Sequence, residues 1–299
     1  MSILVLGTVA LDTVKTPSGF KKDLLGGSAV HFSMAARLFT DVHLVANVGE
    51  DFPRKHLAFL SAKGIHIDSL MRDKGKTFRW QGAYEGDLNA ATTLDTQLGV
   101  LSSFKPCISS TQSGMRHVFL ANVDPAIQQY LLSRMRKPLF VGLDSMNYWI
   151  AHKRNALIKV LKNVDLYVAN DQEARTLSGE INLVKAARAL RALGPRLVLI
   201  KKGEHGVLLA GEDFIFCLPA FPVEKVVDPT GAGDSFAGGF MGYVASQKTM
   251  RAQTLKQAVA FGTICASFNV QGFGVAVTAG LTLAKIRKRL QVFKRSVAL

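Results

Sequence analysis

Long apolar runs and paired cysteines are what this 299-residue sequence lacks. No stretch approaches the roughly 18 uninterrupted apolar residues that a membrane-spanning helix needs, so we expect no membrane association. The first residues are apolar but lack a basic leader and reach Asp12 early, which argues against a secretory signal. Cys107, Cys217 and Cys265 are odd in number and far apart, which argues against a disulfide framework or a cysteine zinc site. We therefore expect a cytoplasmic protein.

Acidic residues are also scarce, because 22 Asp and Glu stand against 37 Lys and Arg and leave a net charge of +15. Such a balance favours anionic partners: nucleic acid, a membrane surface or a phosphorylated small molecule. In the densest basic run, residues 285–295, Ile286, Leu290 and Phe293 recur at helical spacing. This pattern predicts a terminal helix that docks by one face and leaves its basic face in solvent. Aromatic residues are not interleaved with the basic ones, so we expect no nucleic-acid partner.

Short β-rich runs alternate with helical patterns along almost the whole chain. Strands are predicted at 2–9, 42–46, 117–120, 139–143, 166–169 and 196–200, and helices at 29–39, 52–62, 126–135, 155–161, 183–193, 234–246 and 255–270. This alternation predicts a single α/β domain over residues 1–299, with a mainly parallel sheet and helices on both faces. Ligands of such folds bind beyond the carboxyl ends of the strands.

Residues 71–101 interrupt the alternation. Polar and apolar side chains alternate over residues 77–84, and a polar stretch that contains glycine follows. The segment is too short for a domain of its own, so we interpret it as a small antiparallel β lid inserted into the α/β body. Arg79 and Gln81 lie two residues apart on the predicted strand and therefore share one face.

The stretch VDPTGAGDSFAGG, residues 227–239, combines a turn with the start of a helix. Its glycines allow several backbone N–H groups to point the same way, and the helix that begins near Asp234 adds its positive end. An ionised carboxylate beside such an anion hole suits phosphoryl transfer, because it can orient and deprotonate an attacking hydroxyl. A plain turn followed by an N-terminal helix acid is the alternative interpretation. That alternative leaves Gly238, Gly239 and Gly242 unexplained, whereas close backbone approach to a neighbouring element or a nucleotide would explain them.

These residues closely resemble the C-terminal signature of the ribokinase (PfkB-type) family of carbohydrate and nucleoside kinases. The resemblance covers essentially the whole chain, since further similar segments follow in the family's order at 7–12, 25–29, 47–51, 170–173 and 201–206. It implies a ribokinase-like fold and an ATP-dependent kinase that phosphorylates an alcohol group of a small polyhydroxylated molecule. A sugar is the first expectation, and a nucleoside or an inositol-like polyol is the alternative. A ligand-binding member without catalysis is a further alternative.

The resemblance also implies roles on the phosphate side of the site. Asp234 corresponds to the catalytic base, and the amides of Gly231, Ala232 and Gly233 correspond to the anion hole. The remaining residues implied here are Lys201, Gly203 and Gly206 for ATP, Asn170 and Glu173 for Mg²⁺ through water and the ATP phosphates, and Asp228 and Thr230 for a possible K⁺. Without the family, the Asn170–Glu173 pair is equally well interpreted as a helix N-cap with an acid in the first turn.

On the acceptor side the resemblance is looser. It implies substrate contacts from Asp12, Gly26, Gly27, Ser28, His31, Arg79, Gln81 and Asn147. Apart from the resemblance, the exposed lid is a possible surface for pairing two subunits. His31 stands where many sugar kinases have Asn, Lys201 stands where ribokinase-like chains often have Thr, and Asn147 is spaced one residue wider from Asp144 than in the family. These departures leave phosphoryl transfer intact and the identity of the acceptor open.

Overall fold

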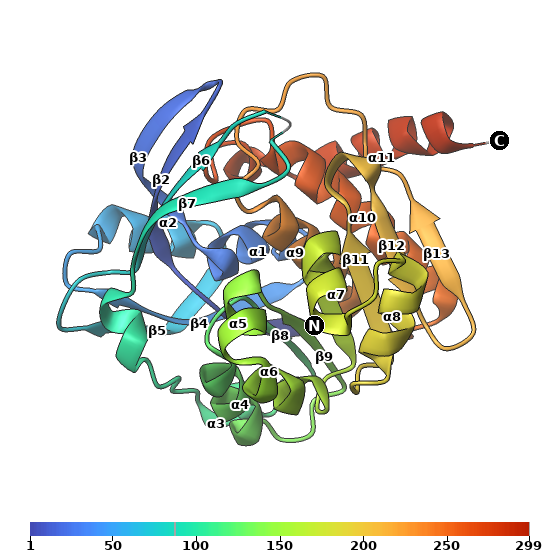
Figure 1. The fold of residues 1–299 in the computed structure, drawn as a ribbon. Helices are drawn as coiled ribbons and strands as arrows, with labels where there is room; N and C mark the ends of the chain where they lie inside the picture. The colour runs from blue at the N-terminus through green and yellow to red at the C-terminus, as the bar shows by residue number, and fades with distance from the viewer. Residues whose placement is uncertain (87, 299) are drawn as a thin grey trace.

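The computed structural model describes residues 1–86 and 88–298 and places a nine-stranded sheet at the centre of this part of the chain (Figure 1). The sheet order is β13-β12-β11-β10-β9-β8-β1-β4-β5. Its strands are β1 (Ser2–Leu6), β4 (Asp41–Gly49), β5 (Ile65–Asp73), β8 (His117–Leu120), β9 (Phe140–Asp144), β10 (Leu166–Asn170), β11 (Leu197–Lys201), β12 (Val207–Ala210) and β13 (Ile215–Leu218). The pairs from β11 to β5 are parallel, and β12 and β13 add an antiparallel edge.

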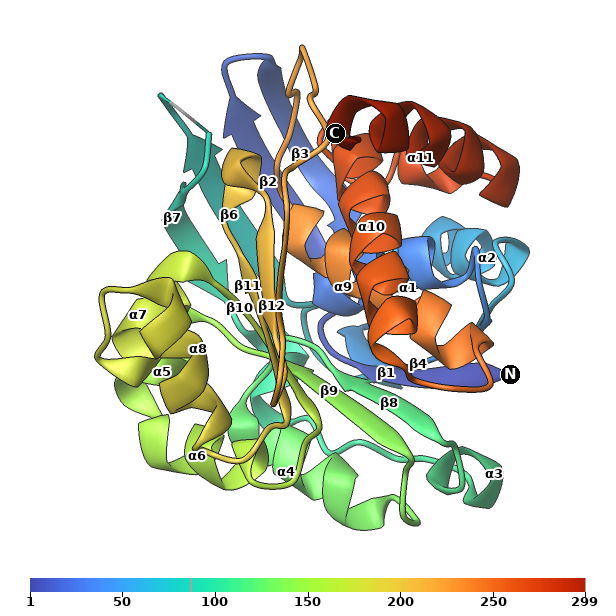
Figure 2. The same ribbon diagram turned by 90° about the vertical axis from the view of Figure 1, so that its right-hand side faces the viewer.

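Helices cover both faces of this sheet (Figure 2). One layer holds α1 (Ser28–Ala36), α2 (Arg54–Ala62), α9 (Ala232–Ser246), α10 (Ala252–Asn269) and α11 (Leu283–Val297). The other layer holds α4 (Pro125–Arg134), α5 (Asn147–His152), α6 (Arg154–Leu161), α7 (Asp171–Ser178) and α8 (Leu183–Arg191). Shorter helical segments lie in the connections: η1 (Gly99–Ser103), α3 (Ser110–Ser113), η2 (Gly203–His205) and η3 (Thr278–Gly280). A separate apolar core fills the space on each side of the sheet. The predicted fold class is confirmed.

The lid is a second, four-stranded sheet with the order β3-β2-β6-β7. Its strands are β2 (Ala10–Thr16), β3 (Gly19–Gly26), β6 (Arg79–Tyr84) and β7 (Ala91–Gln97). The hairpins β2–β3 and β6–β7 are antiparallel, and a parallel β2–β6 pair joins them. The sequence predicted the β6–β7 half. It missed the half at residues 10–26, because the exposed residues of β3 show no alternating pattern and β2 is held by pairing with β6. The strand predicted at 2–9 ends at Leu6.

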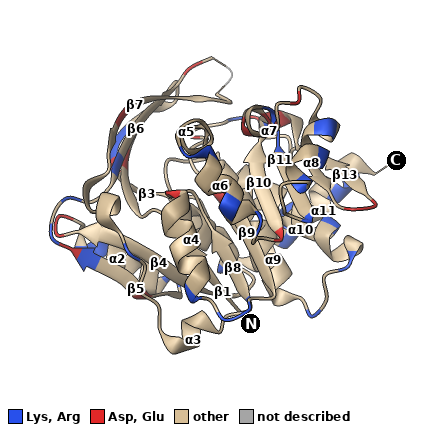
Figure 3. Cartoon of the chain, turned by 60° about the horizontal axis from the view of Figure 1, so that its bottom comes forward, with Lys and Arg blue, Asp and Glu red and all other residues tan. Residues whose placement is uncertain are grey.

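The basic C-terminal segment docks as predicted. Ile286, Leu290 and Phe293 of α11 are buried in a small cluster with Ile264 and Cys265 of α10. Lys and Arg lie on several elements around the molecule, among them α2, α6 and α8 (Figure 3). Within the described ranges, no helix combines the length and the apolar character that crossing a membrane would require.

The glycines inside α9 allow three helices to pack at backbone distance. A Cβ on Gly238 would lie 2.2 Å from the carbonyl oxygen of Phe32 on α1, and one on Gly242 would lie 2.8 Å from Cα of Ala36. On the other side, a Cβ on Gly239 would lie 3.1 Å from Cα of Gly262 on α10. Neighbouring helices therefore account for these glycines. Their approach holds the N-terminus of α9 against α1.

Substituting Gly238 by Ala tests this packing. The added methyl group would overlap a backbone oxygen that cannot turn aside, so we expect the free energy of unfolding to fall by about 1–3 kcal/mol even though Ala favours helix. Gly280→Ala is the control, because nothing lies within 4 Å of its Cβ position, and we expect a change within about 0.5 kcal/mol. Urea unfolding measures both. Equal stability of the two variants would contradict this account of the packing.

Candidate active site

Three neighbouring strands bring charged and polar side chains to the carboxyl edge of the main sheet. Asp144 ends β9, Asn170 ends β10 and Lys201 ends β11, in the order in which the strands pair. Lys201 Nζ donates to Asp144 Oδ2 at 3.0 Å, and both side chains are largely buried. A Cβ on Gly233 would lie 2.8 Å from Lys201 Nζ, so the ammonium group lies against the first turn of α9. Asp234 follows in the same turn.

The glycine turn enters α9 through a left-handed residue. Gly231 is the N-cap at φ 73°, and a Cβ there would lie 2.2 Å from Cγ of His31. The N–H of Ala232 donates to the carbonyl oxygen of Pro229 at 3.1 Å, which closes the turn. The first N–H groups of a helix have no acceptor within the helix. The N–H of Ala232, which was expected in the anion hole, is already bonded to Pro229, so the N–H groups of Gly231 and Gly233 remain as its candidates. This arrangement can attract an anion.

Asn269, the last residue of α10, holds the turn in place. Its Oδ1 accepts from Nδ1 of His31 at 3.1 Å and from Oγ of Ser235 at 3.0 Å. Its Nδ2 donates to the carbonyl oxygen of Thr230 at 2.7 Å. Asn269 is almost fully buried, so these bonds fix the turn against α1 and α10. The sequence did not predict this role of Asn269, for which a polar residue at the end of an apolar helix was the available signal.

Burial dominates the electrostatics of the site. Burial raises the pKa of Asp234 to about 7; Asp144 adds to the rise, and Lys201 opposes it. Burial likewise raises the pKa of Glu173 to about 7, again with Asp144 adding and Lys201 opposing. Burial works against the charge on Lys201, but the surrounding carboxylates outweigh it and leave the Lys201 pKa raised. The carboxyl groups thus compete for one buried ammonium group.

Asn170 and Glu173 form a capping box at the start of α7. Asn170 Oδ1 accepts from the N–H of Glu173 at 2.7 Å, and Glu173 Oε2 accepts from the N–H of Asn170 at 2.8 Å. The N-cap interpretation of this pair is therefore realised. The second carboxylate oxygen of Glu173 lies outside the box, and Mg²⁺ prefers oxygen ligands of this kind. A buried carboxyl group whose pKa is raised by burial and by a neighbouring acid fits a divalent cation, because the cation would relieve both effects.

Asp12, expected to contact the acceptor, lies on β2 at the base of the lid. Its Oδ2 accepts from the N–H of Gly27 at 3.2 Å, and a Cβ on Gly26 would lie 1.9 Å from the same oxygen. Gly27 has φ 96° and a Cβ there would lie 2.4 Å from the carbonyl oxygen of Thr8. Gly26 therefore leaves room for the carboxylate, and Gly27 allows the left-handed turn close to the backbone of Thr8. Burial raises the pKa of Asp12 to about 7, with the N–H of Gly27 opposing and nearby acids adding.

Three other residues expected on the acceptor side have structural partners. The Ser28 hydroxyl accepts from the N–H of Thr8 and donates to the carbonyl oxygen of Asn122. Arg79 forms ion pairs with Asp23 and, at 3.1 Å, with Asp51, which ties β6 to β3 and to the loop after β4. His31 packs beneath Gly231, as described above.

Gln81 and Asn147 are placed less centrally. Gln81 is half-buried on β6, and Asn147 is exposed in the first turn of α5, three residues after the buried Asp144. The structure therefore brings Asp12, His31 and the glycine turn together more tightly than it does these two residues.

The glycines after β11 form the turn toward the lid. Gly203 has φ 55°, and a Cβ there would lie 2.4 Å from Oδ1 of Asn89 in the β6–β7 hairpin. Gly206 has φ 86°, and a Cβ there would lie 2.1 Å from the carbonyl oxygen of Leu218. Asn89 also donates to Glu204 at 3.3 Å, so the tip of the lid touches this turn. The lid therefore contacts the main sheet's end at this turn.

Asp228 links two loops beneath the glycine turn. It is fully buried, its Oδ1 accepts from the N–H of Thr230 at 2.9 Å, and its Oδ2 accepts from the N–H of Gly274 at 3.0 Å. The Thr230 hydroxyl donates to Tyr84 of the lid at 3.3 Å. These bonds connect the glycine turn to both the C-terminal loop and the lid.

Comparison with known proteins agrees with this geometry. Residues 3–279 match the pfkB family of carbohydrate kinases. A cytidine kinase of Thermococcus kodakarensis is 31% identical over 269 residues, which is 88% of this chain and 93% of that protein. Among solved structures, the nucleoside kinase of Methanocaldococcus jannaschii superposes with a TM-score of 0.78 at 20% identity, over 97% of this chain and 98% of that one.

A third relative was solved with ligands. It is the aminoimidazole riboside kinase of Salmonella enterica, complexed with aminoimidazole riboside and an ATP analogue, with a TM-score of 0.77 and 21% identity over 97% of this chain and 100% of that one. The family match extends over nearly the whole chain and includes the glycine turn with Asp234. The chain therefore belongs to the PfkB family of carbohydrate kinases, phosphotransferases whose acceptor is an alcohol group.

Proposed function

We propose that this chain transfers the γ-phosphoryl group of ATP to a hydroxyl group on the ribose of a nucleoside, with a free sugar as the second candidate. The observation that carries the transfer is Asp234 in the first turn of α9, beside the N–H groups of the glycine turn and the Lys201 ammonium. The nucleoside is favoured because a cytidine kinase is 31% identical over most of both chains. The sequence alone favoured a sugar, and the kinase class is common to both.

Asp234 is the group that receives the proton of the acceptor hydroxyl. With a pKa raised to about 7 by burial, it is substantially ionised at neutral pH and is also a strong enough base to share the proton. Phosphoryl transfer passes through a loose transition state, so orientation of the hydroxyl matters more than basicity. Asp12 accepts hydrogen bonds from other hydroxyl groups of the acceptor and thereby fixes that orientation.

Negative charge on the transferred group faces two positive features of the chain. One is the N-terminus of α9 with the N–H groups of Gly231 and Gly233, and the other is Lys201, which lies against Gly233. Gly203, Gly206, Asn170 and Glu173 would line the ATP phosphates on the opposite side. The lid, with Arg79 and Gln81 on β6, excludes water from the reacting groups.

Glu173 and Asn170 would hold Mg²⁺ through water, with Asp144 as a further carboxylate that interacts with Glu173. When bound, Mg²⁺ supplies charge neutralisation between the β- and γ-phosphates. A K⁺ ion near Asp228 and Thr230 would bind the loop that precedes the glycine turn. Both oxygens of Asp228 already accept backbone N–H groups, so such an ion would depend mainly on carbonyl oxygens of that loop.

The single domain over residues 1–299, a cytoplasmic location and a homodimer formed through the lid are further parts of the proposal. Every residue of β7 is exposed, and β7 is the outer strand of the lid sheet. An open strand of this kind can pair with the same strand of a second copy.

A screen of acceptors tests the function. ATP consumption should be measured with nucleosides, pentoses, hexoses, inositols and sugar acids in the presence of Mg²⁺, with Asp234→Asn as the blank. We expect a nucleoside to give the highest kcat/KM and this turnover to vanish in the blank. A higher kcat/KM for a free sugar would move the assignment to the second candidate, and no Asp234-dependent turnover with any acceptor would contradict catalysis.

A further inference from the structure

Two histidines and an aspartate gather on the main sheet at the edge remote from the active site. His43 lies near the amino end of β4, and His66 and Asp68 lie on β5, the edge strand. One ligand atom from each of the three lies within 4.8 Å of the others. Among residues 1–86 and 88–298, no other group of three or more His, Cys, Asp and Glu side chains has its ligand atoms this close together.

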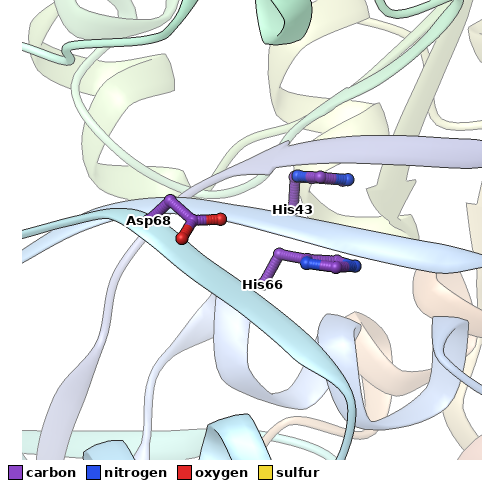
Figure 4. A group of neighbouring side chains, drawn as sticks. All are labelled: His43, His66 and Asp68. Carbon is purple, nitrogen blue, oxygen red and sulfur yellow. The ribbon is translucent and has the colours of Figure 1, made fainter.

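The sheet register produces this cluster. His43 and His66 are directly paired on the parallel strands, and Asp68 follows His66 at the spacing that returns a side chain to the same face. The register then shifts. Val45, two residues after His43, pairs with Ser69, three residues after His66, so β5 carries one extra residue opposite β4. Such a bulge turns a strand locally. Figure 4 shows the result: the two rings lie parallel, and the Asp68 carboxylate lies beside the same edges of both.

One buried polar atom of the cluster has no partner in the part of the chain that the structure describes. Nδ1 of His43 is buried and has no hydrogen-bond partner among the described residues. The rings of His43 and His66 stack with centroids 4.2 Å apart and an interplanar angle of 9°, a contact that brings two potential ligands together. His66 and Asp68 are exposed, which leaves an open path for a solvated ion.

The chemistry of the three groups selects a class of ligand. Two imidazole nitrogens and one carboxylate oxygen suit Zn²⁺ and the neighbouring first-row transition metals rather than Mg²⁺ or Ca²⁺, which prefer oxygen alone. Imidazole binds a metal in its neutral form. The rings are parallel, so binding requires each to rotate about its side-chain bonds until its nitrogen faces the ion.

We propose that His43, His66 and Asp68 bind one divalent transition-metal ion, with Zn²⁺ as the first candidate and water completing the coordination. The ion would connect the edge strand β5 to β4 near the amino ends of the strands, whereas the kinase site lies at their carboxyl ends. It would therefore stabilise the edge of the sheet without entering the reaction. The site is independent of the proposed kinase function.

Titration of the full chain with ZnCl₂ after removal of metals tests the proposal, with calorimetry and the melting temperature as readouts and no nucleotide present. We expect one bound Zn²⁺ that is lost or weakened at least about tenfold in His66→Ala and in Asp68→Asn, and a Zn²⁺-dependent rise in melting temperature that both variants lack. Both positions are exposed, so the variants should fold.

His152→Ala is the matched control, because His152 is also exposed and stacked on a neighbouring ring, at 4.4 Å from Tyr148, but lies outside the cluster. It should bind Zn²⁺ like the original chain. Any Zn²⁺ bound at the kinase site remains in all variants and is subtracted with the double variant His66→Ala/Asp68→Asn. Titrations of that double variant that match the original chain would overturn the proposal, and Mg²⁺-dependent kinase turnover of His66→Ala should be unchanged.

Discussion

Replacing Asp234 by Asn is expected to lower kcat/KM for the accepted substrate by about 10²–10⁴-fold, the usual contribution of a positioned general base. Asn has the same shape but cannot take the proton of the attacking hydroxyl. The original enzyme should also lose kcat/KM as the pH falls below about 7, because protonation of Asp234 in the free enzyme removes the base. Steady-state kinetics between pH 5 and 9 measure both effects. An Asn variant with undiminished turnover would contradict the assigned role.

The same substitution, which lowers activity, should increase the stability of the fold at alkaline pH. The pKa of Asp234 is about 7 in the folded chain and 3.8 in the ordinary case, so folding favours the protonated form. The corresponding stability is present below about pH 4 and is lost as the pH rises through 7, because the carboxylate must then ionise in a buried place. Asn stays neutral. We therefore expect Asp234→Asn to raise the melting temperature at pH 8 and to leave it nearly unchanged at pH 4.

Asp171→Asn is the control for this stability effect. Asp171 is also an acid in the first turn of a helix, but its side chain is half-exposed and pairs with Arg175 at 3.7 Å. Its substitution should not produce a gain that grows with pH. A gain at pH 8 common to both variants would show that the loss of a negative charge at any helix start, and not the burial of Asp234, is responsible.

The α/β body could be predicted because its strands and helices carry their own patterns. β8, at His117–Leu120, coincides with the predicted strand, and β10 and β11 differ from prediction by one residue at their ends. These strands are runs of buried apolar residues, which can be recognised in the sequence without knowing the strands that pair with them. The β2–β3 half of the lid escaped prediction because it is stabilised by pairing with β6, a contact between residues far apart in the sequence.

The candidate site divides in the same way. The glycine turn and Asp234 are contiguous, so the sequence alone indicated an anion hole beside a carboxylate. The Asn269 bonds to His31 and Thr230 join α10 to elements that lie far away in the sequence, and only the fold brings them together. The Lys201–Asp144 pair was hidden for a related reason, since it joins two strands across the intervening β10.

Loss of the Lys201–Asp144 ion pair should lower the stability of the protein strongly. Lys201→Met should lower the free energy of unfolding at pH 8 by about 3–5 kcal/mol, because it leaves the Asp144 carboxylate, only 6% exposed, without its cation. Lys201 also opposes the rise in the pKa of Asp234, so its loss should move the acid limb of kcat/KM to higher pH. Urea unfolding and the pH profile measure the two effects. Lys202→Met, at the adjacent position on the chain, is the control and should change neither strongly.

A double-mutant cycle separates the ion pair from simple loss of packing. If the cost of Lys201→Met arises from the uncompensated Asp144 carboxylate, then Lys201→Met/Asp144→Asn should be more stable at pH 8 than Lys201→Met alone. Were the double variant no more stable than the single one at pH 8, the buried charge would not be the reason for the loss. Lys201 would then act mainly through the packing of its side chain beneath Gly233.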